Sequence, residues 1–235
     1  MHIAILMTNT DESAFAARHP RDGEKFTALI QEARPGWTTE VHGVKDGAFP
    51  ESLAGLGGVV ITGSPASARS DAAWVQELLQ VIRDAVAEGL PLFGACFGHQ
   101  AIARALGGAV GENDGPFVLG LVDVLLAEAA PWMTPAPARV RIAAAHGEQV
   151  TKLPDGAVVN AEGPGCAIGG FHIGDRVFTT EYHPEMTHGF VAALIDALDG
   201  KMDPAVIARA RASLDRPADR ALFAEWIARF FEHAR

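Results

Sequence analysis

Short apolar runs and amphipathic stretches alternate through the first hundred residues. Short continuous apolar runs and one stretch of alternating apolar and polar residues predict β-strands. Apolar residues spaced three and four positions apart predict helices between these strands. The strands are expected over residues 3–7, 37–44, 57–63 and 90–95, and the helices over residues 26–33, 75–86 and 97–106. Strands that alternate with helices in this way indicate a parallel sheet covered by helices on both faces.

The pattern changes in the second half of the chain. Residues 109–185 are rich in Gly, Pro and short Val/Ile runs, which predict several strands, some of them antiparallel. From residue 187 onward helices return, and Asp203-Pro204 is a good helix start. The last helix carries an apolar stripe typical of core packing: Phe223, Trp226, Ile227, Phe230 and Phe231. The expected fold is α/β: a mainly parallel, flavodoxin-like open sheet with extra antiparallel strands, in a single domain over residues 1–235.

Composition and charge narrow the class of partner and the compartment. The formal net charge is −10 with no basic run, which disfavours nucleic acid and anionic membrane as main partners. Two cysteines in 235 residues do not make a disulfide framework, so a reducing compartment is the default. Neither a signal-type N-terminus nor a membrane-length apolar stretch is visible. A cytoplasmic protein is expected.

The segment Gly94-Ala-Cys96-Phe-Gly98 is the strongest chemical signal. An apolar strand runs directly into Cys96 and a helix starts directly after it, which is the pattern of a nucleophile elbow. The flanking glycines let strand and helix approach closely, and the helix N-terminus favours a thiolate. A lone cysteine is more often a buried small hydrophobe, and that interpretation is kept for Cys166, which has no such frame.

A thiol nucleophile needs a base, and His183 is the best placed of nine histidines. It is expected at the end of a strand over residues 177–183, with Glu185 two positions on. In extended backbone these two side chains share a face, so Glu185 would orient the imidazole. A metal site of His183, Glu185 and His188 is the alternative. Pro184 makes a helix through His183 unfavourable, so no metal is expected.

These residues resemble the class I, triad-type glutamine amidotransferase family over residues 3–185. Four features carry the resemblance. They are the Gly94-Ala-Cys96-Phe-Gly-His-Gln100 segment, Ile61-Thr-Gly-Ser-Pro65, the pair Gly107-Gly108, and Glu181-Tyr-His-Pro-Glu185. The first matches the family's G-x-C-x-G-x-Q nucleophile segment, and the last its Q-x-H-P-E ending. Because no synthetase-like segment follows, the chain looks like a stand-alone member, similar to the glutaminase half of GMP synthase.

The resemblance implies a role for each matched residue. Cys96 would attack the side-chain amide of glutamine, with His183 as proton carrier and Glu185 as its orienting acid. The backbone N–H groups of Ser64 and Phe97 would form an oxyanion hole, with Gly63 permitting the turn. Gln100 would help to hold the substrate. The resemblance implies no cofactor. The implied partners are glutamine or a γ-glutamyl compound and, in some members, a synthetase or acceptor subunit.

Several positions depart from the family pattern. Ser64 replaces a glycine that is common before the proline, and Glu181 replaces the usual Gln. Residues 111–120 only loosely resemble the segment that closes over glutamine. In the segment 145–150, Glu148 stands where the family commonly has Asp. These departures concern the choice of substrate more than the chemistry.

Three alternatives stay open from the sequence. An enzyme with the same chemistry could cleave γ-glutamyl amides or peptides, because the attacked carbon is the same and fold does not fix the substrate. A non-catalytic binding domain is disfavoured by the intact Cys96, His183 and Glu185. A flavodoxin-type phosphate loop at residues 62–67 is disfavoured by Pro65, which lacks an N–H donor.

Overall fold

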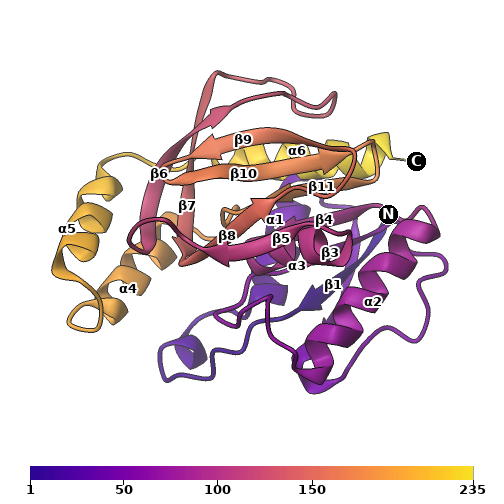
Figure 1. The fold of residues 1–235 in the computed structure, drawn as a ribbon, viewed down its shortest axis with the longest axis horizontal. Coiled ribbons are helices and arrows are strands. Elements are labelled where there is room, and N and C mark those ends of the chain that lie inside the picture. Colours follow the sequence, from indigo (N-terminus) through magenta and orange to yellow (C-terminus); the bar gives the residue numbers. More distant parts are fainter. Residues whose placement is uncertain (235) are drawn as a thin grey trace.

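A nine-stranded mixed sheet organises the molecule in the computed structural model, which describes residues 1–234 (Figure 1). Its strand order is β2-β1-β3-β4-β11-β10-β9-β6-β7, and β5 and β8 form a separate two-stranded sheet. The strands are β1 (His2–Met7), β2 (Thr38–Gly43), β3 (Gly58–Ile61), β4 (Leu92–Ala95), β5 (Ala109–Glu112), β6 (Val118–Leu126), β7 (Arg139–His146), β8 (Glu148–Lys152), β9 (Ala157–Gly163), β10 (Cys166–Ile173) and β11 (Val177–Thr180).

The first five strands of that order are parallel and have the 2-1-3-4-5 arrangement of flavodoxin-like sheets. The remaining four pair antiparallel. The helices are α1 (Asp22–Ala33), α2 (Ala73–Ala87), α3 (Phe97–Ala105), α4 (His188–Leu198), α5 (Pro204–Ala212) and α6 (Arg220–His233). Short 3-10 turns occupy Ala16–Arg18, Val44–Asp46 and Ser213–Asp215. The sequence-based fold class is therefore confirmed, including the extra antiparallel strands.

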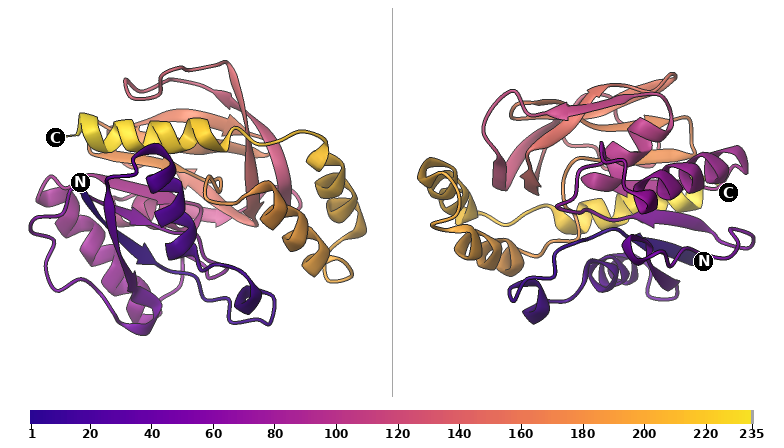
Figure 2. Two further views of the ribbon diagram at one scale, coloured as in Figure 1. Left: turned by 180° about the vertical axis from the view of Figure 1, so that it is seen from behind. Right: turned by 60° about the horizontal axis from the view of Figure 1, so that its bottom comes forward.

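Helices cover both faces of the parallel half because its strands are apolar on both sides. Ile3 and Ile5 of β1 pack with α1 and α6, whereas Ala4 and Leu6 pack with α2 and α3. Figure 2 shows α6 in yellow lying next to α1 on one face. The aromatic stripe of α6 is buried there, as its spacing predicted. This layering leaves the carboxyl ends of the parallel strands open for a site.

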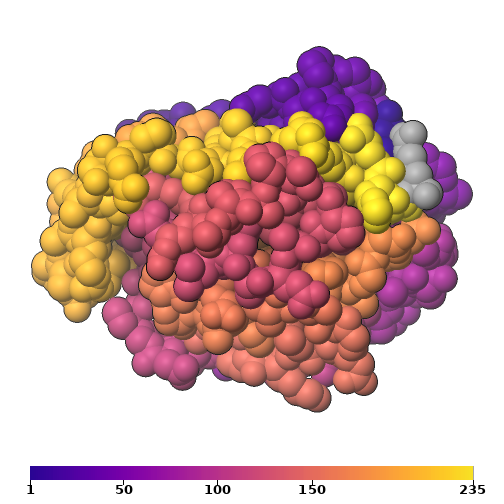
Figure 3. All heavy atoms as spheres, turned by 90° about the horizontal axis from the view of Figure 1, so that it is seen from above, coloured from indigo at the N-terminus to yellow at the C-terminus, as the bar shows by residue number. Residues whose placement is uncertain are grey.

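The antiparallel half has its own cover. Helices α4 and α5 pack against Leu119 and Leu121 of β6 and Ala143 of β7. Helix α5 begins at Pro204, and Asp203 caps it by accepting the N–H of Ala205 at 2.7 Å. Figure 3 shows the yellow C-terminal segment running beside the pink and orange strands of this half. In the part of the chain that the structure describes, no helix is long and apolar enough to cross a membrane.

One element ends earlier than the sequence predicted. Strand β11 stops at Thr180, so Glu181 to Glu185 form a turn and not the end of a strand. The turn is closed by the N–H of Met186, which donates to the carbonyl of His183 at 3.3 Å. His183 and Glu185 are therefore brought together by a turn, and the extended-backbone argument for their pairing was wrong. The N–H of His183 instead bonds to Ala143 on β7, at 2.8 Å.

Candidate active site

Cys96 lies on a strained turn between β4 and α3. Its φ is 48° and its ψ −108°, and within residues 1–234 no other non-glycine residue has a positive φ. Such a backbone is costly for a residue with a Cβ and is characteristic of functional turns. Its N–H donates to the carbonyl of Thr180 at 2.9 Å, and its carbonyl accepts from Gln100 at 3.0 Å. The expected elbow is thus present, with the thiol at the helix N-terminus.

Close packing explains why the elbow needs its glycines. A Cβ on Gly98 would lie 2.3 Å from the carbonyl oxygen of Ile61 at the end of β3, and one on Gly94 would lie 2.7 Å from the backbone of Gly98. Both distances are far inside van der Waals contact. The glycines therefore allow β3, β4 and α3 to meet at the elbow, as the sequence predicted.

His183 and Glu185 form a buried pair beside Cys96. Their Nδ1 and Oε1 atoms are 2.7 Å apart, and the two residues are 5% and 1% exposed. The other ring nitrogen, Nε2, makes no hydrogen bond to nitrogen or oxygen in residues 1–234. A Cβ on Gly63 would lie 2.7 Å from Cε1 of His183 and 3.6 Å from Cβ of Cys96, so the imidazole and the thiol share one small space. The structure brings these three predicted residues together.

The electrostatics of this space favour a charged imidazole. Burial lowers the pKa of His183, but the negative charge of Glu185 and the charge and hydrogen bond of Cys96 outweigh it. The net result is a pKa raised well above its usual value. A raised pKa favours the imidazolium form, which is the partner that a thiolate requires in cysteine nucleophiles with a histidine base.

The peptide between Gly63 and Ser64 is held in one orientation. The carbonyl of Gly63 lies 3.1 Å from the hydroxyl of Thr62, which donates to it, and 3.1 Å from the hydroxyl of Thr8. In a trans peptide the N–H points opposite to the C=O, so the Ser64 N–H is turned away from these threonines. Gly63 is not at positive φ, and a glycine at this position provides space beside His183.

Gln100 lines the same cavity but its amide hydrogens are already used. Its Nε2 donates to the carbonyl of Glu148 at 3.1 Å and to Oε1 of Glu181 at 2.8 Å. The carboxylate of Glu148 in turn accepts from the hydroxyl of Ser67 at 2.8 Å and from Arg69 at 2.6 Å. Gln100 thus connects the elbow helix α3 to Glu148 in the segment after β7. The carboxylate of Glu148 connects that segment to the turn after β3.

A cavity of about 450 Å³ opens beside Cys96 and His183. One end is lined by Cys96, His183, Ser64 and Gln100, and the other by the apolar side chains of α4. The β1–α1 loop (residues 8–21) closes one side and continues into a neighbouring hollow of about 350 Å³. A single 3-10 turn at residues 16–18 lies within this loop.

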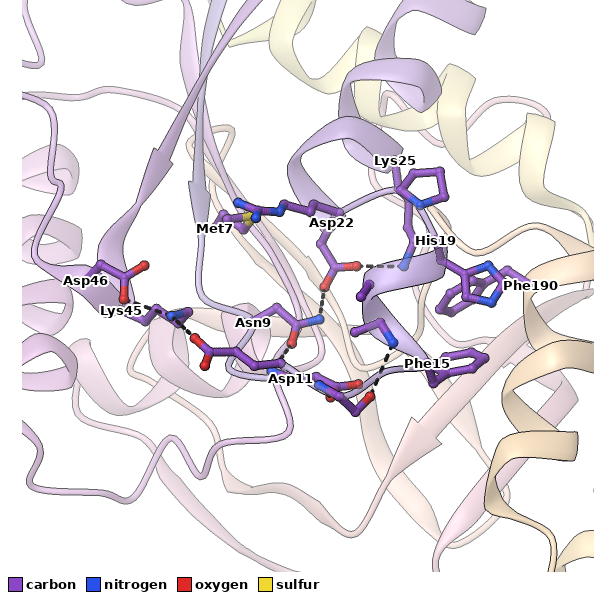
Figure 4. Close-up of a pocket in the computed structure, with 16 residues that line it drawn as sticks. Met7, Asn9, Asp11, Phe15, His19, Asp22, Lys25, Lys45, Asp46 and Phe190 are labelled. Carbon is purple, nitrogen blue, oxygen red and sulfur yellow. Dashed lines mark hydrogen bonds and ion pairs between the residues drawn. The ribbon is translucent and has the colours of Figure 1, made fainter.

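Figure 4 shows how the β1–α1 loop meets α4. The rings of Phe15 and His19 lie 5.7 and 5.2 Å from that of Phe190 on α4. The ammonium of Lys25 lies 3.6 Å from the centre of the same ring, where a cation–π contact is favourable. Asp22 accepts from Lys25 at 2.8 Å and from Asn9 at 2.6 Å. The loop and α4 together form an aromatic cluster beside the ion pair of Asp22 and Lys25.

Some residues of the site escaped sequence reasoning. Thr8, Thr62 and Ser67 act through contacts between segments about 50 to 80 positions apart, which no local pattern records. The signal for the first two was weak: each threonine follows an apolar run that ends a parallel strand. His188, weighed as a metal ligand, lies at the start of α4, with Nε2 3.2 Å from the carbonyl of Leu214. Among residues 1–234, no cluster of His, Cys, Asp and Glu could hold a metal ion.

Comparison with known proteins agrees with this fold. The sequence model of the family described as "Glutamine amidotransferase class-I" matches residues 30–193. The chain belongs to the class I glutamine amidotransferase family. The recognition made from the motifs is thereby confirmed.

Relatives of this chain include proteins named for peptidase and for synthase activities. A protein named "Gamma-glutamyl peptidase 3" from Arabidopsis thaliana is 30% identical over 179 residues, 73% of this chain and 71% of that protein. A glutamine-hydrolysing GMP synthase from Aeropyrum pernix is 30% identical over 141 residues, 60% of this chain but 26% of the synthase. A glutamine amidotransferase structure from Thermotoga maritima has a TM-score of 0.76 at 19% identity and covers 98% of both chains. That last likeness concerns the fold alone.

Proposed function

We propose that this protein hydrolyses a glutamine-type side-chain amide through a thioester on Cys96, releasing ammonia and glutamate when the substrate is glutamine. The observation that carries the proposal is the strained Cys96 at the start of α3, beside a His183 that is paired with Glu185. The continuous nine-stranded sheet supports treating the chain as one domain.

Thioester formation is the first half of the proposed reaction. The Cys96 thiolate attacks the amide carbon, and a C–S bond forms as the carbonyl oxygen becomes an oxyanion. The imidazolium of His183 then gives its Nε2 proton to the leaving nitrogen, the C–N bond breaks, and ammonia departs. Glu185 keeps the proton on Nδ1 and stabilises the imidazolium throughout.

Hydrolysis of the thioester is the second half. The neutral His183 takes a proton from water at Nε2, and the water oxygen attacks the thioester carbon. The second oxyanion collapses, the C–S bond breaks, and glutamate leaves. The thiolate and imidazolium are thereby restored, and no cofactor enters either step.

The proposed oxyanion hole consists of the N–H groups of Phe97 and Ser64. Phe97 is the first residue of α3, where backbone N–H groups have no intrahelical acceptor. The N–H of Ser64 faces away from the threonines that hold the Gly63 carbonyl, which supports an orientation toward the cavity. Both donors are then in place before substrate arrives, which is the condition for effective stabilisation of an oxyanion.

Thr62→Val is expected to lower kcat about 10- to 100-fold with little change in KM. The variant keeps the shape of Thr62 but removes one of the two hydroxyl groups that hold the Gly63 carbonyl, so the peptide that carries the Ser64 N–H is less firmly oriented. Steady-state glutamate release measures the effect. Thr27→Val, which removes a part-buried hydroxyl on α1, is the matched control. An unchanged kcat in Thr62→Val would remove Ser64 from the proposed oxyanion hole.

A second candidate function is hydrolysis of γ-glutamyl amides or peptides, and the size of the cavity favours it. About 450 Å³ is typical of pockets that enclose a larger ligand, whereas ammonia needs about the 30 Å³ of a water molecule. Met186, Phe190, Leu194 and Leu198 line the far end. Such a wall contributes nothing to ammonia, but it would bind the apolar part of a larger amine leaving group.

Glutamate release from glutamine, γ-glutamyl methylamide and γ-glutamyl phenethylamide separates the two candidates. If the apolar wall binds the leaving group, kcat/KM for the phenethylamide exceeds that for glutamine by tenfold or more. Leu194→Ala would then lower the phenethylamide value about tenfold and leave that for glutamine unchanged. Leu125→Ala, at a leucine 42% exposed on β6, is the control.

Each other outcome assigns the site differently. Turnover of glutamine alone, insensitive to Leu194→Ala, would make the protein a glutaminase and favour an ammonia-accepting partner. Absence of turnover with all three compounds would contradict the proposed function itself.

A further inference from the structure

A second carboxyl group, not used in the proposed mechanism, is buried behind the nucleophile. Glu181 is 0% exposed, at the turn that leads from β11 to His183. Its Oε1 accepts the N–H of Gln100 at 2.8 Å. Its Oε2 has no hydrogen-bond partner within residues 1–234 and lies 3.6 Å from Nε2 of His99. An ionised carboxylate here would have a single N–H donor, that of Gln100, to offset the free-energy cost of its removal from water.

The groups that face Glu181 come from every element around it. They are Cys96 at the elbow, His99 and Gln100 on α3, Cys166 on β10, and Tyr182 and His183 on its own turn. His99 is fully buried and neutral: burial lowers its pKa to about 3, and its Nδ1 lies 2.8 Å from the hydroxyl of Thr179. It therefore offers no positive charge to an ionised Glu181.

The charges around Glu181 also favour its protonated form. Burial raises its pKa well above the usual value, and the neighbouring Cys96 raises it further. The hydrogen bond from Gln100 and the charge of His183 act in the opposite direction but are outweighed. His183 is in any case already paired with Glu185 at 2.7 Å. A buried carboxyl without a dedicated cation takes up a proton in preference to a charge.

We propose that Glu181 is a neutral carboxylic acid in the working protein and a positioning residue for the nucleophile. It carries its proton on Oε2, holds the side chain of Gln100 through Oε1, and keeps negative charge away from Cys96. Through Gln100 it also fixes the carbonyl of Glu148, and with it the segment after β7 that lines the cavity. The site thus contains two carboxyl groups with different partners: Glu185 pairs with His183, and Glu181 is protonated beside Cys96.

The proton on Glu181 has a consequence for the thiol. If Glu181 ionised, its negative charge would share one buried space with that of the Cys96 thiolate, which like-charge repulsion disfavours. Glutamine is an isostere of the protonated acid and cannot ionise. Glu181→Gln therefore mimics the proposed state, whereas Glu181→Ala removes both the hydrogen bond and the volume.

The pH dependence of unfolding tests the protonation state without reference to activity. A buried acid that keeps its proton destabilises the native state progressively as pH rises above the usual value of 4.5, because the unfolded chain releases that proton. The folding equilibrium constant of Glu181→Gln relative to wild type should rise about tenfold per pH unit from pH 5, until Glu181 ionises in the native state. Chemical denaturation at pH 5, 6 and 7 measures this ratio. Glu162→Gln, at an exposed glutamate on β9, should show a constant ratio.

Activity gives the second readout, and this part rests on the proposed function. With the better substrate at pH 6.5, Glu181→Gln should retain kcat within about threefold, and Glu181→Ala should lose at least tenfold. A stability ratio for Glu181→Gln that stays constant or falls with pH would overturn the proposal, because Glu181 would then be ionised. Loss of activity in Glu181→Gln with the expected stability ratio would overturn the positioning role alone. Absence of turnover in wild type would instead contradict the proposed function and leave the stability test standing.

Discussion

Replacing Cys96 by alanine is expected to lower kcat for amide hydrolysis by at least about 10⁴-fold. The thiol is the atom to which the substrate carbon bonds, and alanine has no nucleophilic atom to take its place. Removal of a nucleophile in comparable triads costs about 10⁶-fold in kcat. Glutamate release at saturating substrate measures the loss, and thermal unfolding confirms that the variant is folded.

Cys166→Ala is the matched control for this prediction. Cys166 is buried like Cys96, at 1% against 5% exposure, but it lies within β10, and burial raises the pKa of its thiol well above the usual range. It should therefore keep kcat within about twofold and remain unmodified by a thiol-alkylating reagent that labels Cys96. Equal activity of wild type and Cys96→Ala would refute the thioester route.

Glu185→Gln is expected to lower kcat/KM by about 10³- to 10⁴-fold, the size of effect known when the orienting acid of a triad becomes an amide. The amide can donate a hydrogen bond to Nδ1 of His183, which then places the ring proton on the wrong nitrogen. It also removes the negative charge that raises the pKa of His183. Since the imidazolium exists below that pKa, the upper edge of the pH–activity profile should move to lower pH in the variant.

The control for this prediction is Glu128→Gln, which removes an exposed glutamate remote from the cavity. It should leave both the rate and the pH profile unchanged. An upper edge that stays in place in Glu185→Gln would mean that Glu185 contributes no charge to His183, and the 2.7 Å contact would then be structural only.

The sequence predicted the parallel half of the fold better than the antiparallel half. Runs such as Ile3–Met7 and Leu90–Ala95 are short, apolar and separated by amphipathic helices, so each element has its own periodic signal. Residues 109–185 were predicted as strands, but their order was not. The pairing of β6 with both β7 and β9 depends on contacts between residues far apart in sequence. The glycine-containing strands have similar sequence patterns, so the pattern does not specify which strands pair.

The candidate site divides in the same way. Cys96 and Gly98 were predictable because an elbow is a local motif in which each glycine has a steric reason. The pairing of His183 with Glu185 was predicted for the wrong reason, since a turn replaces the expected strand end. The hydroxyls of Thr8 and Thr62 were missed because their function is to orient a peptide on another loop. Glu181 was noted only as a departure, and its burial against His99 belongs to tertiary structure.

The position of β11 has a consequence for the chain as it leaves the ribosome. This strand lies between β4 and β10, so the turn that carries the base is added some ninety residues after the nucleophile has been made. One face of β1 and β3 also remains partly uncovered until α6 is made, because aromatic side chains of α6 pack with Ile3, Ile5 and Val60. A nascent chain that ends before β11 therefore lacks His183 and Glu185, and long-range strand pairing of this kind is slow. The proposed thioester chemistry thus requires a chain that extends past Glu185.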